Sequence, residues 1–316
     1  MAATIVAVEI VLTLVGSAAP NPPLYPGERK PPKRPQTDPL VGWKFLPHAT
    51  VPQDTAEFSV VYRSNRQGFR SPWEFDEPTK HRRIFFLGDS FTMGSGVAEA
   101  ETFASLLEQK LGGVRSYNFG MTWFGVDQMW MTLRHYGLPL EPDLVILCFV
   151  RDDLERSLWA YQKGPVPMAK PSFHLVEGGR LVARTMETRP ADYWLFLRRH
   201  SRILERLRRA QASLSYRFAI GYRWRLNRAI FEQIRDEARA SDVPLVVVYL
   251  PSNRRRPAPA FSREFARMGI DFLDLTPLLP AKPETLYYEH DGHFNAAGHR
   301  FAADAIHAFL VQRNLS

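Results

Sequence analysis

A short apolar run that ends in glycine and leads to a serine is the feature that most constrains this chain. Residues 84–90 read Ile-Phe-Phe-Leu-Gly-Asp-Ser, and a glycine-rich turn follows at residues 93–96. An apolar run of this length, stopped by Gly88, predicts a buried strand. In α/β proteins, the loops at the carboxyl ends of parallel strands hold the reactive groups. Ser90 is therefore a candidate nucleophile, exposed by the turn between a strand and a helix.

Beyond this point, strand-like and helix-like patterns alternate regularly. Apolar runs predict strands at residues 84–87, 115–119, 144–150, 245–250 and 271–275. Apolar residues at helical spacing predict helices at residues 102–111, 126–135, 193–241 (interrupted near 219–222) and 295–312. Strands that alternate with helices form parallel sheets covered on both faces. The pattern therefore predicts a three-layer α/β/α fold around a five-stranded parallel sheet.

The first 80 residues are organised differently. Residues 1–19 are almost wholly apolar, with Glu9 as the single charge, which predicts a transmembrane or signal segment. Residues 20–40 read as a proline-rich, semi-rigid linker. Residues 41–80 are predicted to form an N-terminal extension with short strands, one of them at residues 57–63. Residues 81–316 then make up the main domain.

The apolar N-terminal segment bears on where the main domain lies. We expect a membrane-tethered or secreted, extracytoplasmic domain. The opposite topology stays open, because no Lys or Arg precedes the apolar segment and four follow it between Arg29 and Arg34. Under the positive-inside rule, that charge distribution favours a cytoplasmic domain.

Composition excludes several classes of function. The net charge is +8 and the isoelectric point is near 9.7. The basic residues fall mainly in the proline-rich stretch and in residues 198–228, without a nucleic-acid-binding motif, so we expect no nucleic-acid partner. Cys148 is the only cysteine, which excludes an intrachain disulfide and a cysteine-cluster metal site. We expect neither a cofactor nor a metal ion.

Three further segments fall where loops at strand ends should lie. Gly120 follows the second predicted strand, and a glycine there can bring its backbone N–H close to a substrate oxygen. The paired acids Asp152 and Asp153 follow the third strand and suit either a site or a helix N-cap. Asp291 and His293 precede the last helix, where an acid and an imidazole can face one cleft.

Taken together in this order, these segments resemble the conserved blocks of the SGNH/GDSL hydrolase superfamily, in particular bacterial members with a membrane-proximal extension. The resemblance covers about residues 82–312. It implies a flavodoxin-like fold and a serine esterase in which Ser90 attacks an ester carbonyl. It also implies that His293 is the general base, that Asp291 orients it, and that the backbone N–H groups of Ser90 and Gly120 stabilise the oxyanion.

The chain departs from the superfamily pattern at two positions. Asp291 stands two residues before His293, whereas the superfamily commonly has three, so Glu289 or His290 is an alternative or supplementary partner. Asp152 occupies the position of an oxyanion-binding asparagine. An ionised carboxylate repels an oxyanion, so Asp152 either stays protonated, or two backbone donors suffice, or turnover is slow.

Three functions remain compatible with these residues. The first is an esterase that hydrolyses acyl esters, in particular acetyl esters, on a carbohydrate or cell-envelope substrate or on a small ester. The second is a carbohydrate O-acyltransferase that uses the same triad. The third is a non-catalytic binding module that keeps the fold. Aromatic residues near the strand ends are candidates for stacking on sugar rings or for the core: Trp123, Phe124, Trp130, Trp159 and Tyr161.

Overall fold

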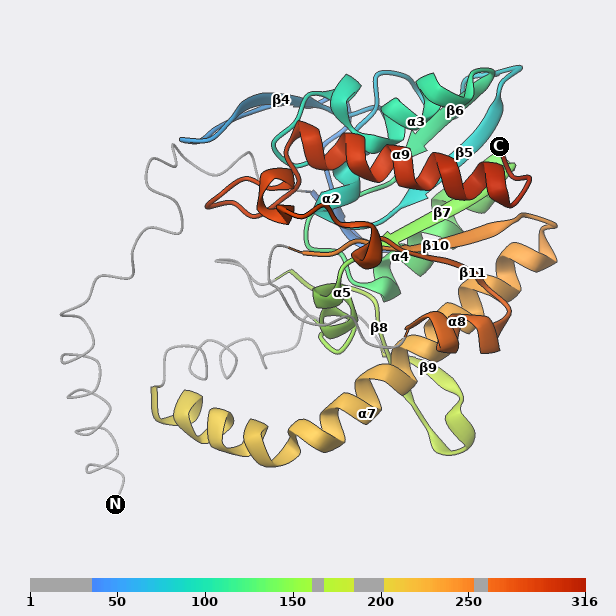
Figure 1. Ribbon diagram of the computed structural model, residues 1–316. Coiled ribbons are helices and arrows are strands. Elements are labelled where there is room, and N and C mark those ends of the chain that lie inside the picture. Colours follow the sequence, from blue (N-terminus) through green and yellow to red (C-terminus); the bar gives the residue numbers. More distant parts are fainter. Residues whose placement is uncertain (1–35, 161–167, 185–201, 253–260) are drawn as a thin grey trace.

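The computed structural model describes residues 36–160, 168–184, 202–252 and 261–316 (Figure 1). The predicted apolar segment at residues 1–19 and all but the last five residues of the predicted linker lie outside this set. Tyr161, one of the aromatic candidates, also lies outside it. Within the described ranges, no helix is both long enough and apolar enough to cross a membrane.

The centre of the molecule is a parallel sheet in the order β11-β10-β7-β5-β6. Its strands are β5 (Arg82–Leu87), β6 (Val114–Asn118), β7 (Leu144–Phe149), β10 (Leu245–Tyr249) and β11 (Asp271–Asp274). All neighbouring pairs are parallel, and this order is that of flavodoxin-like folds. The five predicted strands are confirmed, and their ends differ by at most two residues from the prediction.

Helices connect these strands. The α-helices are α2 (Ser90–Met93), α3 (Phe103–Leu111), α4 (Val126–Thr132), α5 (Arg151–Arg156), α7 (Arg202–Ala240), α8 (Phe261–Met268) and α9 (Ala296–Gln312). Shorter 3-10 or π turns are η1 (Glu99–Glu101), η2 (Leu133–Gly137), η3 (Leu138–Leu140), η4 (Glu177–Gly179), η5 (Thr276–Leu278) and η6 (Pro283–Leu286).

The interruption predicted near residues 219–222 is wrong, because α7 runs through them unbroken. The segment contains no proline, and its one glycine, Gly221, is exposed. A glycine at an exposed position inside a helix costs only about 1 kcal/mol relative to alanine. That penalty is too small to end a 39-residue helix whose C-terminal half packs on the sheet.

The sheet has a separate apolar core on each face. Alternate side chains of a strand point to opposite faces, so Phe86 and Ile146 pack under α3 and α9. Phe85 and Leu147 pack on the other side with α4, α7 and α8. Figure 1 shows the sheet between α9 and the pair α7 and α8. The three-layer prediction is therefore confirmed.

The N-terminal extension contributes to two short hairpins. In the first, β1 (Gln36–Asp38), which lies in the predicted linker, pairs with β2 (Gly42–Lys44), and in the second, β3 (Thr50–Asp54) pairs with β4 (Ser59–Arg63). A third hairpin, β8 (Ser172–Leu175) with β9 (Leu181–Arg184), lies between α5 and α7 in the chain. The extension packs into the core of the main domain. Val41, Trp43 and Phe69 are fully or almost fully buried and belong to the core beneath α4 and α7.

A buried histidine joins the two helices on one face of the sheet. His299, in α9, is 1% exposed, and its Nδ1 accepts the backbone N–H of Phe103 at the start of α3. Burial, assisted by the charge of Arg70, lowers the pKa of His299 from 6.5 to about 3. The imidazole is therefore neutral in the folded protein at any pH well above 3.

We expect His299 to make the fold sensitive to acid. Its folded pKa is depressed, so its stabilising contribution is complete above pH 6.5 and declines as the pH falls toward 3. Between pH 7 and pH 4 the expected loss is about 3 kcal/mol in the free energy of unfolding. Urea titrations of wild type and His299→Gln should show this loss in the wild type only. An equal acid loss in both proteins would contradict the assignment.

Candidate active site

The turn after β5 places Ser90 at the carboxyl end of the sheet. Asp89 caps α2, because its Oδ1 accepts the backbone N–H of Phe91 at 2.9 Å. Gly88 is required by close packing, since a methyl group there would lie 2.8 Å from the carbonyl oxygen of Cys148 and closer still to Thr92. Ser90 is the first residue of α2, which begins directly after the short turn that follows the central strand β5.

The structure brings the three predicted catalytic residues into one chain of hydrogen bonds. The Nε2 of His293 lies 2.7 Å from the Oγ of Ser90, and its Nδ1 contacts the Oδ1 of Asp291. The ring of Phe91 packs against the imidazole, with 4.9 Å between centroids. Burial alone would raise the pKa of Asp291, but the hydrogen bonds and charge of His293 outweigh it and hold that pKa below its ordinary value. Asp291 is therefore an ionised partner for the imidazole at neutral pH.

A spacing of two residues suffices for this pair because the loop turns tightly. Asp291 Oδ1 accepts the backbone N–H of His293 at 3.2 Å and also contacts the ring Nδ1 of the same residue. The loop is closed by the N–H of Tyr288, which donates to the carbonyl of His293 at 2.9 Å. Glu289 and His290, the alternative partners, are both exposed.

Substitution of the two acids should separate their roles. Asp291→Asn should lower kcat by about 10²- to 10⁴-fold, because the amide cannot stabilise a charged imidazole or hold its tautomer. Glu289→Gln should leave kcat nearly unchanged, since the side chain is exposed. Steady-state kinetics on an activated ester measures both variants. A larger loss in Glu289→Gln than in Asp291→Asn would reverse the assignment.

The backbone N–H of Gly120 has a hydrogen-bond partner within the protein. It donates to the Oδ1 of Asn118 at 2.9 Å, while the Asn118 amide donates to the carbonyl of Thr92 at 2.8 Å. A side chain on Gly120 would overlap the backbone of Thr92 and Met93. The glycine is thus needed for the close approach of this loop to α2, and its predicted role as an oxyanion donor stays a prediction.

The paired acids after β7 have different surroundings. Asp152 is exposed on the first turn of α5, and its predicted oxyanion role stays a prediction. Asp153 is fully buried and accepts the backbone N–H of Val150 at 2.9 Å. Arg156 Nη1 lies 2.5 Å from Asp153 Oδ1 and 2.9 Å from Asp89 Oδ2. This guanidinium connects α5 to Asp89, the residue that precedes Ser90.

Two carboxylates share this one guanidinium in a buried setting. Burial and the neighbouring charge of Asp89 raise the pKa of Asp153 well above its ordinary value, against the opposing effect of Arg156. Sequence reasoning missed Arg156, because an arginine within a short helix carries no pattern of its own. The available signal was its spacing from Asp153, because residues at i and i+3 of a helix face each other and can form an ion pair.

The N-terminal extension also contacts the segment that follows Ser90. Arg70 is completely buried and donates to the carbonyls of Met93, Gly94 and Val97 at 3.1, 2.7 and 2.8 Å. Its Nε lies 2.5 Å from the Glu99 carboxylate. These carbonyls belong to the end of α2 and the loop after it. The extension therefore fixes the short helix that carries Ser90.

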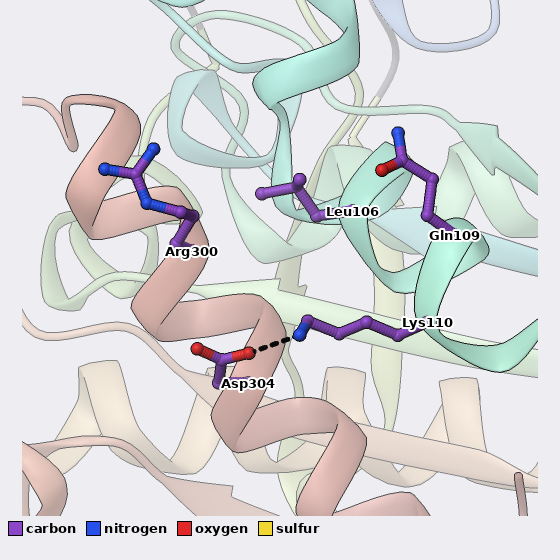
Figure 2. Close-up of a pocket in the computed structure, with 5 residues that line it drawn as sticks. All are labelled: Leu106, Gln109, Lys110, Arg300 and Asp304. Atoms are coloured by element: carbon purple, nitrogen blue, oxygen red, sulfur yellow. Dashed lines mark ion pairs between the residues drawn. The ribbon is translucent and has the colours of Figure 1, made fainter.

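A surface hollow elsewhere on the molecule is not this site. Figure 2 shows it between α3 and α9, lined by Leu106, Gln109, Lys110, Arg300 and Asp304. Lys110 and Asp304 form an ion pair across it, with 2.6 Å between Nζ and Oδ1. None of the predicted site residues lines it. Nor do the described residues contain a cluster of side chains suited to hold a metal ion.

A serine hydroxyl bonded to an imidazole that is bonded to a carboxylate, at the end of a flavodoxin-like sheet, defines a serine hydrolase. The chain belongs to the GDSL-like lipase/acylhydrolase family, whose model matches residues 86–301, and it is a hydrolase that acts on ester bonds. No curated protein sequence shows significant similarity to the chain.

Solved structures with a similar fold have low sequence identity to this chain. A lipase/acylhydrolase from Enterococcus faecalis is 13% identical, with 73% of this chain and 96% of that chain covered and a TM-score of 0.43. A putative lipolytic protein of the G-D-S-L family from Desulfitobacterium hafniense is 12% identical over 73% and 100%, with a TM-score of 0.43. The esterase EstA from Pseudoalteromonas is 10% identical over 74% and 100%, with a TM-score of 0.44.

Proposed function

We propose that this protein is a serine esterase that removes acyl groups, in particular acetyl groups, from a carbohydrate or cell-envelope substrate. The observation that carries the proposal is the continuous contact from Ser90 Oγ through His293 to Asp291. A serine hydroxyl becomes an effective nucleophile only when an adjacent base takes its proton. Family membership supports the ester bond as the target.

In the proposed mechanism, Ser90 Oγ attacks the ester carbonyl while His293 Nε2 takes the hydroxyl proton. Asp291 holds the imidazole in the required tautomer and stabilises its positive charge. The backbone N–H of Ser90, at the N-terminus of α2, donates to the developing oxyanion. His293 then protonates the departing alcohol. In the second half-reaction, water activated by His293 releases the acid from Ser90.

An exposed aromatic ring supports a carbohydrate substrate. Among the described candidates, Trp123 is 52% exposed, Trp159 is half-buried, and Phe124 and Trp130 are buried. The Arg156 guanidinium lies 5.6 Å from the centre of the Trp123 ring and bonds to Asp89, next to Ser90. An exposed aromatic ring connected to Asp89 through Arg156 suits stacking on a sugar ring. A membrane-tethered or secreted location outside the cytoplasm is part of the same proposal and rests on residues 1–19.

Two measurements test the proposal: which acyl group the enzyme removes, and whether water or a sugar hydroxyl receives it. Purified protein is incubated with p-nitrophenyl acetate, p-nitrophenyl palmitate and a panel of O-acetylated polysaccharides, and released acid is quantified. We expect release of free acetate from at least one polysaccharide and a preference for acetate over palmitate. Preference for palmitate would overturn the acetyl assignment. Acetyl transfer to a sugar hydroxyl without release of acetate would favour the acyltransferase instead.

A further inference from the structure

The loop that carries the acid and histidine is held by a residue far away in the sequence. Glu57 lies in the turn between β3 and β4. Its carboxylate accepts the backbone N–H of Asp291 at 2.8 Å and that of His290 at 3.1 and 3.2 Å. The family model begins at residue 86, so Glu57 lies outside the part of the chain that the family shares.

Further contacts attach the same hairpin to both catalytic segments. The ring of Phe58 packs on Tyr288, with 5.0 Å between centroids, at the base of the Asp291 loop. Tyr288 Oη donates to the carbonyl of Gly96 at 2.8 Å, and Tyr62 Oη accepts the N–H of Gly96 at 2.9 Å. Gly96 belongs to the loop after α2. The β3–β4 hairpin therefore lies between the nucleophile segment and the acid–base segment and contacts both.

We propose that Glu57 is a positioning residue for Asp291, so that the N-terminal extension completes the catalytic centre. The inference deepens the proposed function and rests on it. A carboxylate that accepts two successive backbone N–H groups fixes both position and orientation of a loop, because charge-assisted hydrogen bonds are short and directional. Asp291 must hold His293 toward Ser90, and a displacement of about 1 Å in a catalytic group costs about 100-fold in rate.

Substitutions at Glu57 should lower turnover without weakening substrate binding. We expect Glu57→Ala to reduce kcat by about 10- to 100-fold with little change in KM, since it loosens the catalytic loop and not the substrate contacts. Glu57→Gln keeps an acceptor oxygen and should recover most of the activity. Glu57→Asp keeps the charge, but its side chain is one methylene shorter and its carboxylate lies too far from the two N–H groups. This variant should therefore lose activity to the same extent as Glu57→Ala.

Glu74→Ala is the matched control. Glu74 is also an acid of the extension and accepts a backbone N–H, that of Arg66 at 2.8 Å, but it lies on no catalytic loop. We expect wild-type kcat from this variant. Proton NMR supplies a second measurement, because the proton on His293 Nδ1 in its contact with Asp291 resonates far downfield. That signal should broaden or shift upfield in Glu57→Ala and stay unchanged in Glu74→Ala.

The results distinguish this inference from the proposed function. Equal kcat in Glu57→Ala and Glu74→Ala would overturn the positioning role. Should Glu57→Ala fail to fold, wild-type activity in Glu57→Asp would overturn it equally. Ser90→Ala is measured in the same assay. Activity that survives in Ser90→Ala defeats the proposed function itself, whereas an inactive Ser90→Ala beside a fully active Glu57→Ala defeats only the inference.

Discussion

Replacement of His293 by alanine should lower kcat/KM for an activated ester by about 10⁴- to 10⁶-fold, close to the loss in Ser90→Ala. The imidazole contacts the Ser90 hydroxyl on one side and Asp291 on the other, so its removal leaves the serine without a base. Stopped-flow or steady-state hydrolysis of p-nitrophenyl acetate measures the change.

The double variant provides the control for this prediction. Members of a triad act as a unit, so Ser90→Ala combined with His293→Ala should be no slower than either single variant. Circular dichroism and thermal melts of all three variants establish that the fold persists. Additive losses in the double variant would show that the two residues act independently and would contradict the hydrogen-bonded arrangement.

Replacement of Arg70 by alanine should be the most destabilising single change considered for this fold. Arg70 is completely buried and pairs with Glu99 while donating to three backbone carbonyls. Its removal leaves three carbonyls without their buried donor, and each buried acceptor left unsatisfied typically costs about 1 to 3 kcal/mol. Urea unfolding should show this loss, and phosphonate labelling of Ser90 should slow because the end of α2 loses its support.

Arg66 offers a matched control four residues earlier. Its ion pair with Asp76 lies on the surface, with 59% and 45% of the two side chains exposed. Exposed ion pairs contribute little because water competes with them. Arg66→Ala should therefore leave the free energy of unfolding almost unchanged. Equal destabilisation in the two variants would show that the buried network around Arg70 does not hold the α2 segment.

The fold was predictable because each central strand is buried on both faces. A strand such as β7 then reads as an unbroken apolar run, and the intervening helices show one apolar stripe. The meeting of Ser90 with Asp291 and His293 follows from the same logic, since the carboxyl ends of parallel strands lie at one edge of a sheet. The strand and helix patterns are local in sequence and set by burial, and the parallel arrangement of the strands brings distant loops to the same edge.

The parts of the site that sequence could not predict depend on distant contacts. Asp152 and Asp153 are the same residue type, and only the orientation of α5 decides that Asp153 faces inward to Arg156. Nor does the sequence indicate that the N–H of Gly120 donates to the Asn118 side chain. In the sequence, Glu57 looks like any acidic residue in a turn between two strands. Its partners lie more than two hundred residues away, and no pattern around it indicates them.

The most direct test of the account is covalent labelling of the serine. A fluorophosphonate probe reacts with a serine hydroxyl only where a neighbouring base activates it. We expect one adduct per protein molecule, located by peptide mass spectrometry on Ser90 and absent from Ser90→Ala and His293→Ala. A wild-type protein that hydrolyses esters but carries no adduct on Ser90, or that is labelled equally after Ser90→Ala, would contradict the account.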